Sequence, residues 1–149
     1  MLALEPSVGT GSIAIPLLKI GCVVDCVELQ EKNAREAAQK ITAAGCRAVI
    51  EVADFLSIPP EQCYDRVIMN PPFARQADIH HVNHALKFLK PGGLLVSVMS
   101  SGVTFRSNRL TTEFRSMIDE RGGEIIPLPE GSFKESGTGV NTVIVKIPA

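Results

Sequence analysis

The sequence lacks a dominant sign of charge and any long apolar run. Lys and Arg number 15 against 16 Asp and Glu, and the formal net charge is -1 at pH 7. No overall basic field therefore favours a nucleic acid partner, although a local basic patch would suffice. No apolar run approaches the roughly 20 residues of a membrane span, and no signal peptide opens the chain. We therefore expect no membrane partner.

The four cysteines form no C-x-x-C pair of the kind that holds zinc or a redox disulfide. They are Cys22, Cys26, Cys46 and Cys63. Four cysteines allow two disulfides, but this spacing favours reduced, partly buried thiols in a cytoplasmic protein. We expect no zinc site.

The length of 149 residues is that of a single domain with a substantial core, and we assign residues 1–149 to one domain. Seven strands are expected at 2–5, 23–28, 47–54, 64–70, 94–100, 124–129 and 140–148. Helices are expected in SIAIPLLKIG, QEKNAREAAQKITAAG, DIHHVNHALKFLKPGG (before its Pro-Gly-Gly) and NRLTTEFRSMIDERGG. Apolar strands alternating with helices indicate an α/β fold with a largely parallel sheet covered on both faces. The last two strands lie too close together for a helical crossover and should pair antiparallel.

Unusual residues follow the first four predicted strands. In an open parallel α/β sheet, ligands bind at the carboxyl ends of the strands. The first strand is followed by EPSVGTG, whose Gly9 and Gly11 allow the backbone to approach a ligand. A G-x-G pattern alone is weak, because Ala14 occupies the third glycine place of the phosphate-binding motif. A tight structural turn is the alternative explanation.

Acidic residues end the second and third strands. Glu28 can accept both hydroxyls of a ribose, or it can serve as a carboxylate at the start of the next helix. Asp54 can accept from an adenine amino group and Phe55 can offer an apolar face to the ring, unless they are an ordinary loop acid and a buried aromatic. Together these strand ends suit an adenosine-bearing ligand without a P-loop phosphate site.

The fourth strand ends in NPPF, residues 70–73. Two consecutive prolines end a strand because neither has a backbone N–H to donate, and each ring fixes φ. The motif thus presents an amide side chain, two rigid carbonyls and an aromatic ring at the sheet edge. A rigid turn alone does not require that set of groups.

These four strand ends, in this order, resemble the S-adenosylmethionine (SAM)-dependent methyltransferases that act on amino nitrogens. The match is strongest with small phage- or plasmid-type adenine-specific DNA methyltransferases, and it includes MNPPF and the tail FKESGTGVNTVIV. The resemblance implies a Rossmann-like class I methyltransferase fold with SAM as cofactor. It assigns SAM binding to nine residues, Glu5, Pro6, Gly9, Thr10, Gly11, Glu28, Leu29, Asp54 and Phe55, and catalysis to Asn70, Pro71, Pro72 and Phe73.

The NPPF motif suits a poorly nucleophilic aromatic amine. The Asn70 side-chain oxygen and the Pro71 carbonyl can each accept one N–H of the amine, and both can stabilise the positive charge that develops on nitrogen. Phe73 can stack on the target base, which a duplex would have to flip out. Arg75, Phe105 and Arg106 are candidate contacts to the nucleic acid backbone.

Other polar residues fit less specific roles. Arg109 is expected to be a solvated surface residue, and Lys134 is ambiguous between surface and phosphate contact. His80 and His84 would share one face of a helix, but no third ligand accompanies them. We expect no metal site.

Two parts of a DNA methyltransferase have no counterpart in this sequence. No segment is long enough for a target-recognition region, and no helix precedes the first strand. The chain is thus expected to be a fragment, a shortened enzyme, or an enzyme that relies on a specificity subunit or an N-terminal segment. Three functions remain open: methylation of adenine in DNA, methylation of rRNA guanine or a protein glutamine amide, and a non-catalytic SAM-fold subunit.

Overall fold

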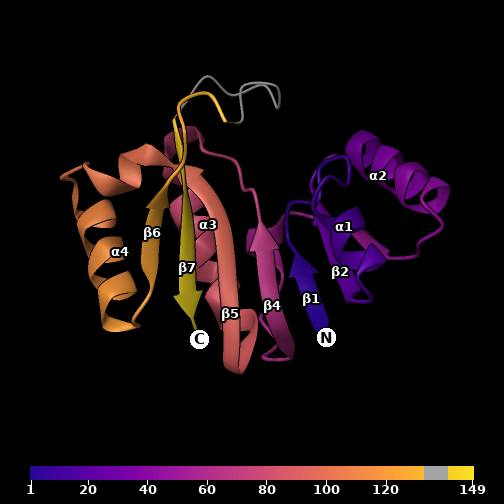
Figure 1. The fold of residues 1–149 in the computed structure, drawn as a ribbon, viewed down its shortest axis with the longest axis horizontal. Coiled ribbons are helices and arrows are strands. Elements are labelled where there is room, and N and C mark those ends of the chain that lie inside the picture. The colour runs from indigo at the N-terminus through magenta and orange to yellow at the C-terminus, as the bar shows by residue number, and fades with distance from the viewer. Residues whose placement is uncertain (133–140) are drawn as a thin grey trace.

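The computed structural model describes residues 1–132 and 141–149, so the tail segment FKESGTG, which includes Lys134, lies outside the described residues. The seven predicted strands form one sheet in the order β3-β2-β1-β4-β5-β7-β6 (Figure 1). Their bounds are β1 (Leu2–Glu5), β2 (Val23–Glu28), β3 (Val49–Val52), β4 (Tyr64–Met69), β5 (Leu89–Ser100), β6 (Glu124–Pro127) and β7 (Thr142–Pro148).

The sheet is mainly parallel. β1 pairs with β2 and β4, β3 pairs with β2, and β5 pairs with β4, all in parallel. β7 runs antiparallel to both β5 and β6, and its arrow in Figure 1 points opposite to those of its neighbours. The predicted fold class is therefore confirmed, including the antiparallel pairing of the last two strands.

Helices cover both faces of the sheet, because alternate side chains of a buried strand point to opposite faces. The helices are α1 (Ala14–Lys19), α2 (Glu31–Ala43), α3 (Ala77–Ala85) and α4 (Arg109–Glu120). Ala3 and Val24 pack with α1 and α2 on one face. Leu4 and Val27 belong to the larger core with α3 and α4 on the other. Pro16 lies in the first turn of α1, where proline removes no intrahelical hydrogen bond.

Several strand boundaries differ from the prediction, and the differences are largest at β3 and β5. β3 is shorter than residues 47–54, because this edge strand keeps only the residues that pair with β2. β5 begins at Leu89 and not at Leu94, so Pro91-Gly92-Gly93 does not interrupt it. The pairing with β4 shifts register between Tyr64 and Arg66, and such an irregularity accommodates proline and glycine within a strand.

All four cysteines are free thiols. Cys26 is buried against the α1 and α2 face, and burial raises the pKa of its thiol to about 12. In the described part of the chain, no helix is long and apolar enough to span a membrane.

Candidate functional site

The carboxyl ends of β1, β2, β3 and β4 converge on one cavity of about 290 Å³. Eight of the thirteen residues predicted for the site line it: Pro6, Gly9, Glu28, Leu29, Asp54, Phe55, Asn70 and Pro72. These residues come from four separate segments of the sequence. The parallel strands place them together because their carboxyl ends share one edge of the sheet.

Glu28 connects the two loops on the β1–β2 side of the cavity. Its carboxylate is buried, with Oε2 accepting from the Gly9 N–H at 2.8 Å and Oε1 from the Gln30 N–H at 3.1 Å. Both of its anticipated roles are thus compatible, because a carboxylate has about four acceptor sites and two remain for ribose hydroxyls.

Glu5 lies directly before the cavity-lining Pro6 and does not itself line the cavity. It is 1% exposed, Oε1 accepts from the Ser7 N–H at 3.3 Å, and Oε2 is buried without a partner among the described residues. Burial raises the pKa of Glu5 well above its usual value, the Ser7 N–H opposes the shift, and the negative charge of Glu28 adds to it. A nearby cation would compensate this buried acid, so the residue fits SAM, whose sulfur and amino groups are positively charged.

The glycine loop needs glycine for its backbone geometry. Gly9 and Gly11 have φ of +54° and +96°, in the region that disfavours side chains. Gly11 and Thr10 do not line the cavity, so the structure places Gly11 in the turn that leads into α1.

Asp54 and Phe55 form the β3 wall of the cavity. Asp54 is exposed, and its Oδ1 accepts from the Leu56 N–H at 3.1 Å. Phe55 is only 2% exposed, and its ring packs against His84 and Phe88 with centroids 5.0 and 5.1 Å away. The Phe55 ring is therefore held in the core, and only part of it can face a ligand.

The NPPF motif follows β4 and forms the opposite wall. Asn70 is half-buried and lines the cavity together with the exposed Pro72. Pro71 is buried between them, and Phe73 is half-buried; neither lines the cavity. Asn70 therefore shares one cavity with Gly9 and Glu28.

Four further residues line the cavity without having been predicted: Ser7, Gln30, Ala53 and His81. His81 belongs to α3, and its Nδ1 is buried without a partner among the described residues. Burial lowers the pKa of His81, and the nearby Asp54 opposes this shift, so the ring is neutral at pH 7. Its proximity to Asp54 arises from the packing of α3, which no local sequence pattern specifies.

The histidines considered for a metal site are dispersed. His80 is exposed, whereas Nε2 of His84 lies 2.9 Å from the carbonyl oxygen of Ile58. No group of three or more potential metal ligands occurs in residues 1–132 and 141–149.

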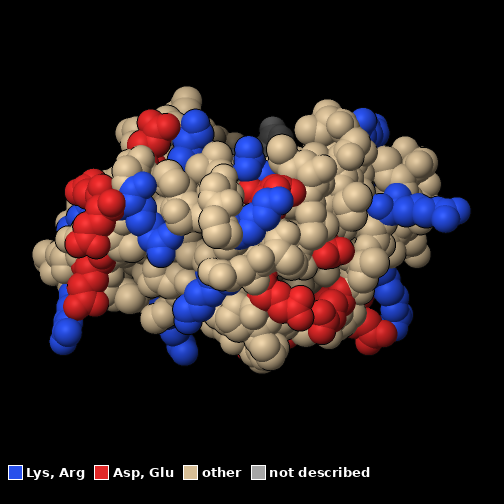
Figure 2. Space-filling model, turned by 90° about the horizontal axis from the view of Figure 1, so that it is seen from below, with Lys and Arg blue, Asp and Glu red and all other residues tan. Residues whose placement is uncertain are grey.

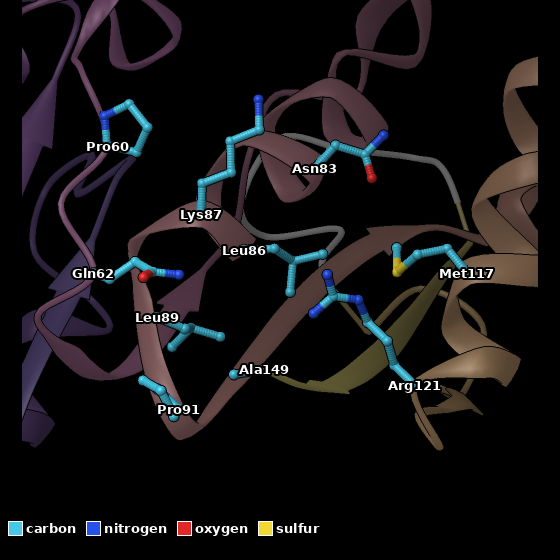
Figure 3. A pocket seen from close by; sticks show the side chains of 10 residues that line it. All are labelled: Pro60, Gln62, Asn83, Leu86, Lys87, Leu89, Pro91, Met117, Arg121 and Ala149. Atoms are coloured by element: carbon cyan, nitrogen blue, oxygen red, sulfur yellow. The ribbon is translucent and has the colours of Figure 1, made fainter.

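A larger groove of about 710 Å³ lies at the other edge of the sheet, where β4 and β5 begin and β7 ends. Figure 3 shows Leu86 between the basic side chains Lys87 and Arg121, with Leu89 on one side of them and Met117 on the other. None of the thirteen predicted site residues lines this groove. Figure 2 views this edge and shows basic and acidic side chains interspersed, with neither sign dominating.

The strand order with an antiparallel β7, and the glycine loop and acidic residue at the ends of β1 and β2, define the class I SAM-dependent methyltransferase fold. The chain belongs to the methyltransferase small domain family, whose model matches residues 3–121. The fold, SAM as cofactor and membership of the methyltransferases therefore agree with the predicted resemblance, whereas the adenine-specific DNA methyltransferase type stays a prediction. No curated protein matches the sequence significantly.

Solved structures resemble the whole chain at low sequence identity. A putative class I SAM-dependent methyltransferase from Listeria monocytogenes has a TM-score of 0.77 at 17% identity, over 99% of this chain and 54% of that one. An rRNA methylase from Streptococcus thermophilus gives 0.71 at 13% identity, over 99% and 85%. TrmN from Thermus thermophilus gives 0.72 at 22% identity, over 99% and 43%. The chain thus spans about half the length of two of these three proteins.

Proposed function

We propose that this chain is a SAM-dependent methyltransferase that methylates the exocyclic amino nitrogen of adenine in DNA. The observation that carries the proposal is the shared cavity: Asn70 and Pro72 line it together with Gly9, Glu28 and Asp54. The first two belong to a motif suited to an amino group, and the other three suit an adenosine-bearing cofactor.

The cofactor side of the cavity is provided by loops of fixed geometry. Glu28 would accept from the ribose hydroxyls, Asp54 from the adenine amino group, and the loop at Gly9 would hold the methionine part. When bound there, SAM supplies a methyl group on a positively charged sulfur. The ionised form of Glu5 would be favoured next to that charge.

The acceptor side is provided by the NPPF motif. The Asn70 side-chain oxygen and the Pro71 carbonyl would each accept one N–H of the target amine and hold its lone pair toward the methyl group. The two oxygens would stabilise the positive charge that develops on nitrogen as its bond to the methyl carbon forms and the carbon–sulfur bond breaks. The sulfur would be left as a neutral thioether, and the extra proton on nitrogen would pass to solvent. The proline rings restrict the backbone and keep that carbonyl aimed.

Exposed residues near this edge would contact the nucleic acid. Arg75 follows the NPPF motif, and Phe105 and Arg106 follow β5; all three are exposed, Phe105 by 70%. Arg109 differs, because it forms an exposed ion pair with Glu113 at 2.7 Å. We assign phosphate contact to Arg75 and Arg106, and base or sugar contact to Phe105.

An amino group of an RNA base is the second candidate acceptor. The likeness to an rRNA methylase that covers 85% of that protein's chain favours it. Methylation of a protein glutamine and a non-catalytic role in support of a partner are two further candidate functions. The same experiment separates them.

The experiment is incubation with SAM labelled in the methyl group, in parallel with unmethylated DNA, RNA and protein pools. Digestion to nucleosides and amino acids then identifies the labelled atom. The proposal predicts label in N6-methyladenine from DNA, and none with Asn70→Ala. Asn83→Ala changes an exposed amide in the distant groove and is the matched control.

Label in an RNA base would move the acceptor to the second candidate, and label in glutamine would move it to protein. If a folded protein that binds SAM labels none of the three pools, a catalytic function is wrong. Label that persists in Asn70→Ala would contradict the proposed role of that residue.

A further inference from the structure

The NPPF motif is followed by an unusual backbone turn. Arg75 has φ of 54° and ψ of 35°, and Gln76 has φ of 59° and ψ of 28°. Both lie in the left-handed region, and they are the only non-glycine residues with positive φ in the described part of the chain. Residues with a Cβ atom disfavour this backbone conformation, so two such residues in succession keep it only where surrounding contacts hold them.

The side chain of Gln76 provides such a contact. Its Nε2 donates to Oγ1 of Thr111 at 2.7 Å and lies 3.4 Å from Oδ1 of Asn108. Thr111 is fully buried in α4, and its hydroxyl donates to Asn108 Oδ1 at 2.9 Å. The same Asn108 oxygen accepts from the Thr111 N–H and caps α4. Gln76 therefore joins the end of the NPPF loop to a rigid, capped helix start.

A second side chain anchors the next turn of the chain. Asp78 is buried in α3, and its Oδ2 accepts from the Ser100 N–H at 3.0 Å at the end of β5. The start of α3 is thus fixed on both sides, by Gln76 to α4 and by Asp78 to β5. The turn between these anchors and β4 contains Asn70 to Phe73, whose Phe73 carbonyl accepts from the Gln76 N–H at 3.2 Å.

We propose that Gln76 is a positioning residue: its hydrogen bonds to Thr111 and Asn108 hold the left-handed turn at Arg75–Gln76, and thereby hold the acceptor-side wall at Asn70–Phe73. Gln76 does not line the cavity, so it acts through the backbone of the motif. Its effect on catalysis rests on the proposed function, whereas its effect on the backbone does not.

Substitution of Gln76 by glycine separates the effect of its side-chain hydrogen bonds from the effect of the left-handed backbone conformation. Glycine adopts positive φ without steric cost, so Gln76→Gly keeps the turn accessible and removes only the side-chain link. If conformation alone matters, this variant behaves as the wild type. If the link matters, Gln76→Gly and Gln76→Ala both lose the order of the loop.

The test combines backbone exchange with kinetics. Amide hydrogen exchange of residues 73–77 is measured by mass spectrometry in the wild type, Gln76→Ala, Gln76→Gly and Thr111→Val. Gln39→Ala changes an exposed glutamine of α2 and is the matched control. We expect exchange of this segment to accelerate at least about tenfold in the three linked variants, since opening frees a local unit, and to stay unchanged in the control.

Kinetics separate positioning from folding. We expect kcat to fall by about tenfold to a hundredfold in the Gln76 variants, as for misplaced catalytic groups, while the Kd for SAM changes less than about twofold. The kcat of the double variant Gln76→Ala/Thr111→Val should be no lower than that of either single variant, because both substitutions remove the same hydrogen bond. Additive losses of kcat in the double variant would contradict the claim that Gln76 and Thr111 act through one shared link.

Failure of the positioning role of Gln76 can be distinguished from failure of the proposed methyltransferase function. Unchanged exchange in the Gln76 variants overturns the positioning role, whatever the activity. Accelerated exchange in a protein that transfers no methyl group to any pool supports the link and contradicts the proposed function. Wild-type kcat together with accelerated exchange overturns the claim that the link serves catalysis.

Discussion

The backbone N–H of Gly9 donates to Oε2 of Glu28 at 2.8 Å, across a sequence separation of 19 residues. This hydrogen bond joins the loop after β1 to the end of β2, and both residues line the same cavity. One buried carboxylate thus shapes the glycine loop and stays available to a ligand.

Replacing Glu28 by Gln should weaken SAM binding by about tenfold, the cost of replacing charge-assisted hydrogen bonds with neutral ones. The amide oxygen still accepts one of the two backbone N–H groups, so the fold should be retained. Isothermal titration with SAM measures the change. Glu51→Gln, an exposed acid of β3, is the control, and equal weakening in both variants would contradict the assignment.

The stability of the protein should depend on the ionisation of Glu5. The folded state raises the pKa of Glu5, so between about pH 4.3 and that raised pKa the folded state binds more protons than the unfolded chain. The free energy of unfolding therefore falls as pH rises through this window. Glu5→Gln cannot ionise, so its stability relative to the wild type should increase with pH.

Urea unfolding of both proteins at several pH values measures that difference. At neutral pH the variant should have a higher free energy of unfolding than the wild type while binding SAM more weakly. A constant difference at all pH values would show that Glu5 does not titrate as a buried acid.

Removing the ring of Phe73 should affect the nucleic acid and not the cofactor. Stacking of a base on an aromatic side chain contributes about 1–3 kcal/mol, so Phe73→Ala should raise KM for the nucleic acid by roughly 5- to 150-fold. Phe73 does not line the cavity, so the Kd for SAM should be unchanged. Phe73→Tyr keeps a ring and should retain most of the affinity; equal losses in both variants would rule out stacking.

Asp78 should be important for stability. Asp78→Ala leaves the buried Ser100 N–H without its acceptor, which costs about 1–3 kcal/mol. Chemical denaturation measures the loss. Asp119→Ala, an exposed acid in α4, should change stability little, and a similar loss there would show that the effect is not specific to the Asp78 contact.

Much of the fold could be predicted from the sequence because its signals are local. β1 and β2 match their predicted residues, since short apolar runs are bounded by a glycine turn or a loop. The boundary of β5 could not be predicted, because Pro91-Gly92-Gly93 is a break signal locally. Pairing with β4 and a register shift override that signal.

The candidate site was predictable only in part. Residues at the strand ends, such as Glu28 and Asn70, follow from the rule that parallel strands present their carboxyl ends at one edge. His81 and Gln76 were not predictable, because their roles depend on the rotation of α3 and on a contact 35 residues away. The left-handed turn before α3 uses Arg75 and Gln76, which carry no turn signal.

The central claim is that SAM binds the cavity that Asn70 shares with the glycine loop. The most direct test is a titration of the labelled protein with SAM, followed by amide chemical shifts in nuclear magnetic resonance. We predict saturable shifts at Gly9, Glu28, Asp54 and Asn70, and none at Asn83 or Lys87 in the groove of Figure 3. Shifts confined to the groove, or a SAM complex in which Asn70 is unperturbed, would contradict the claim.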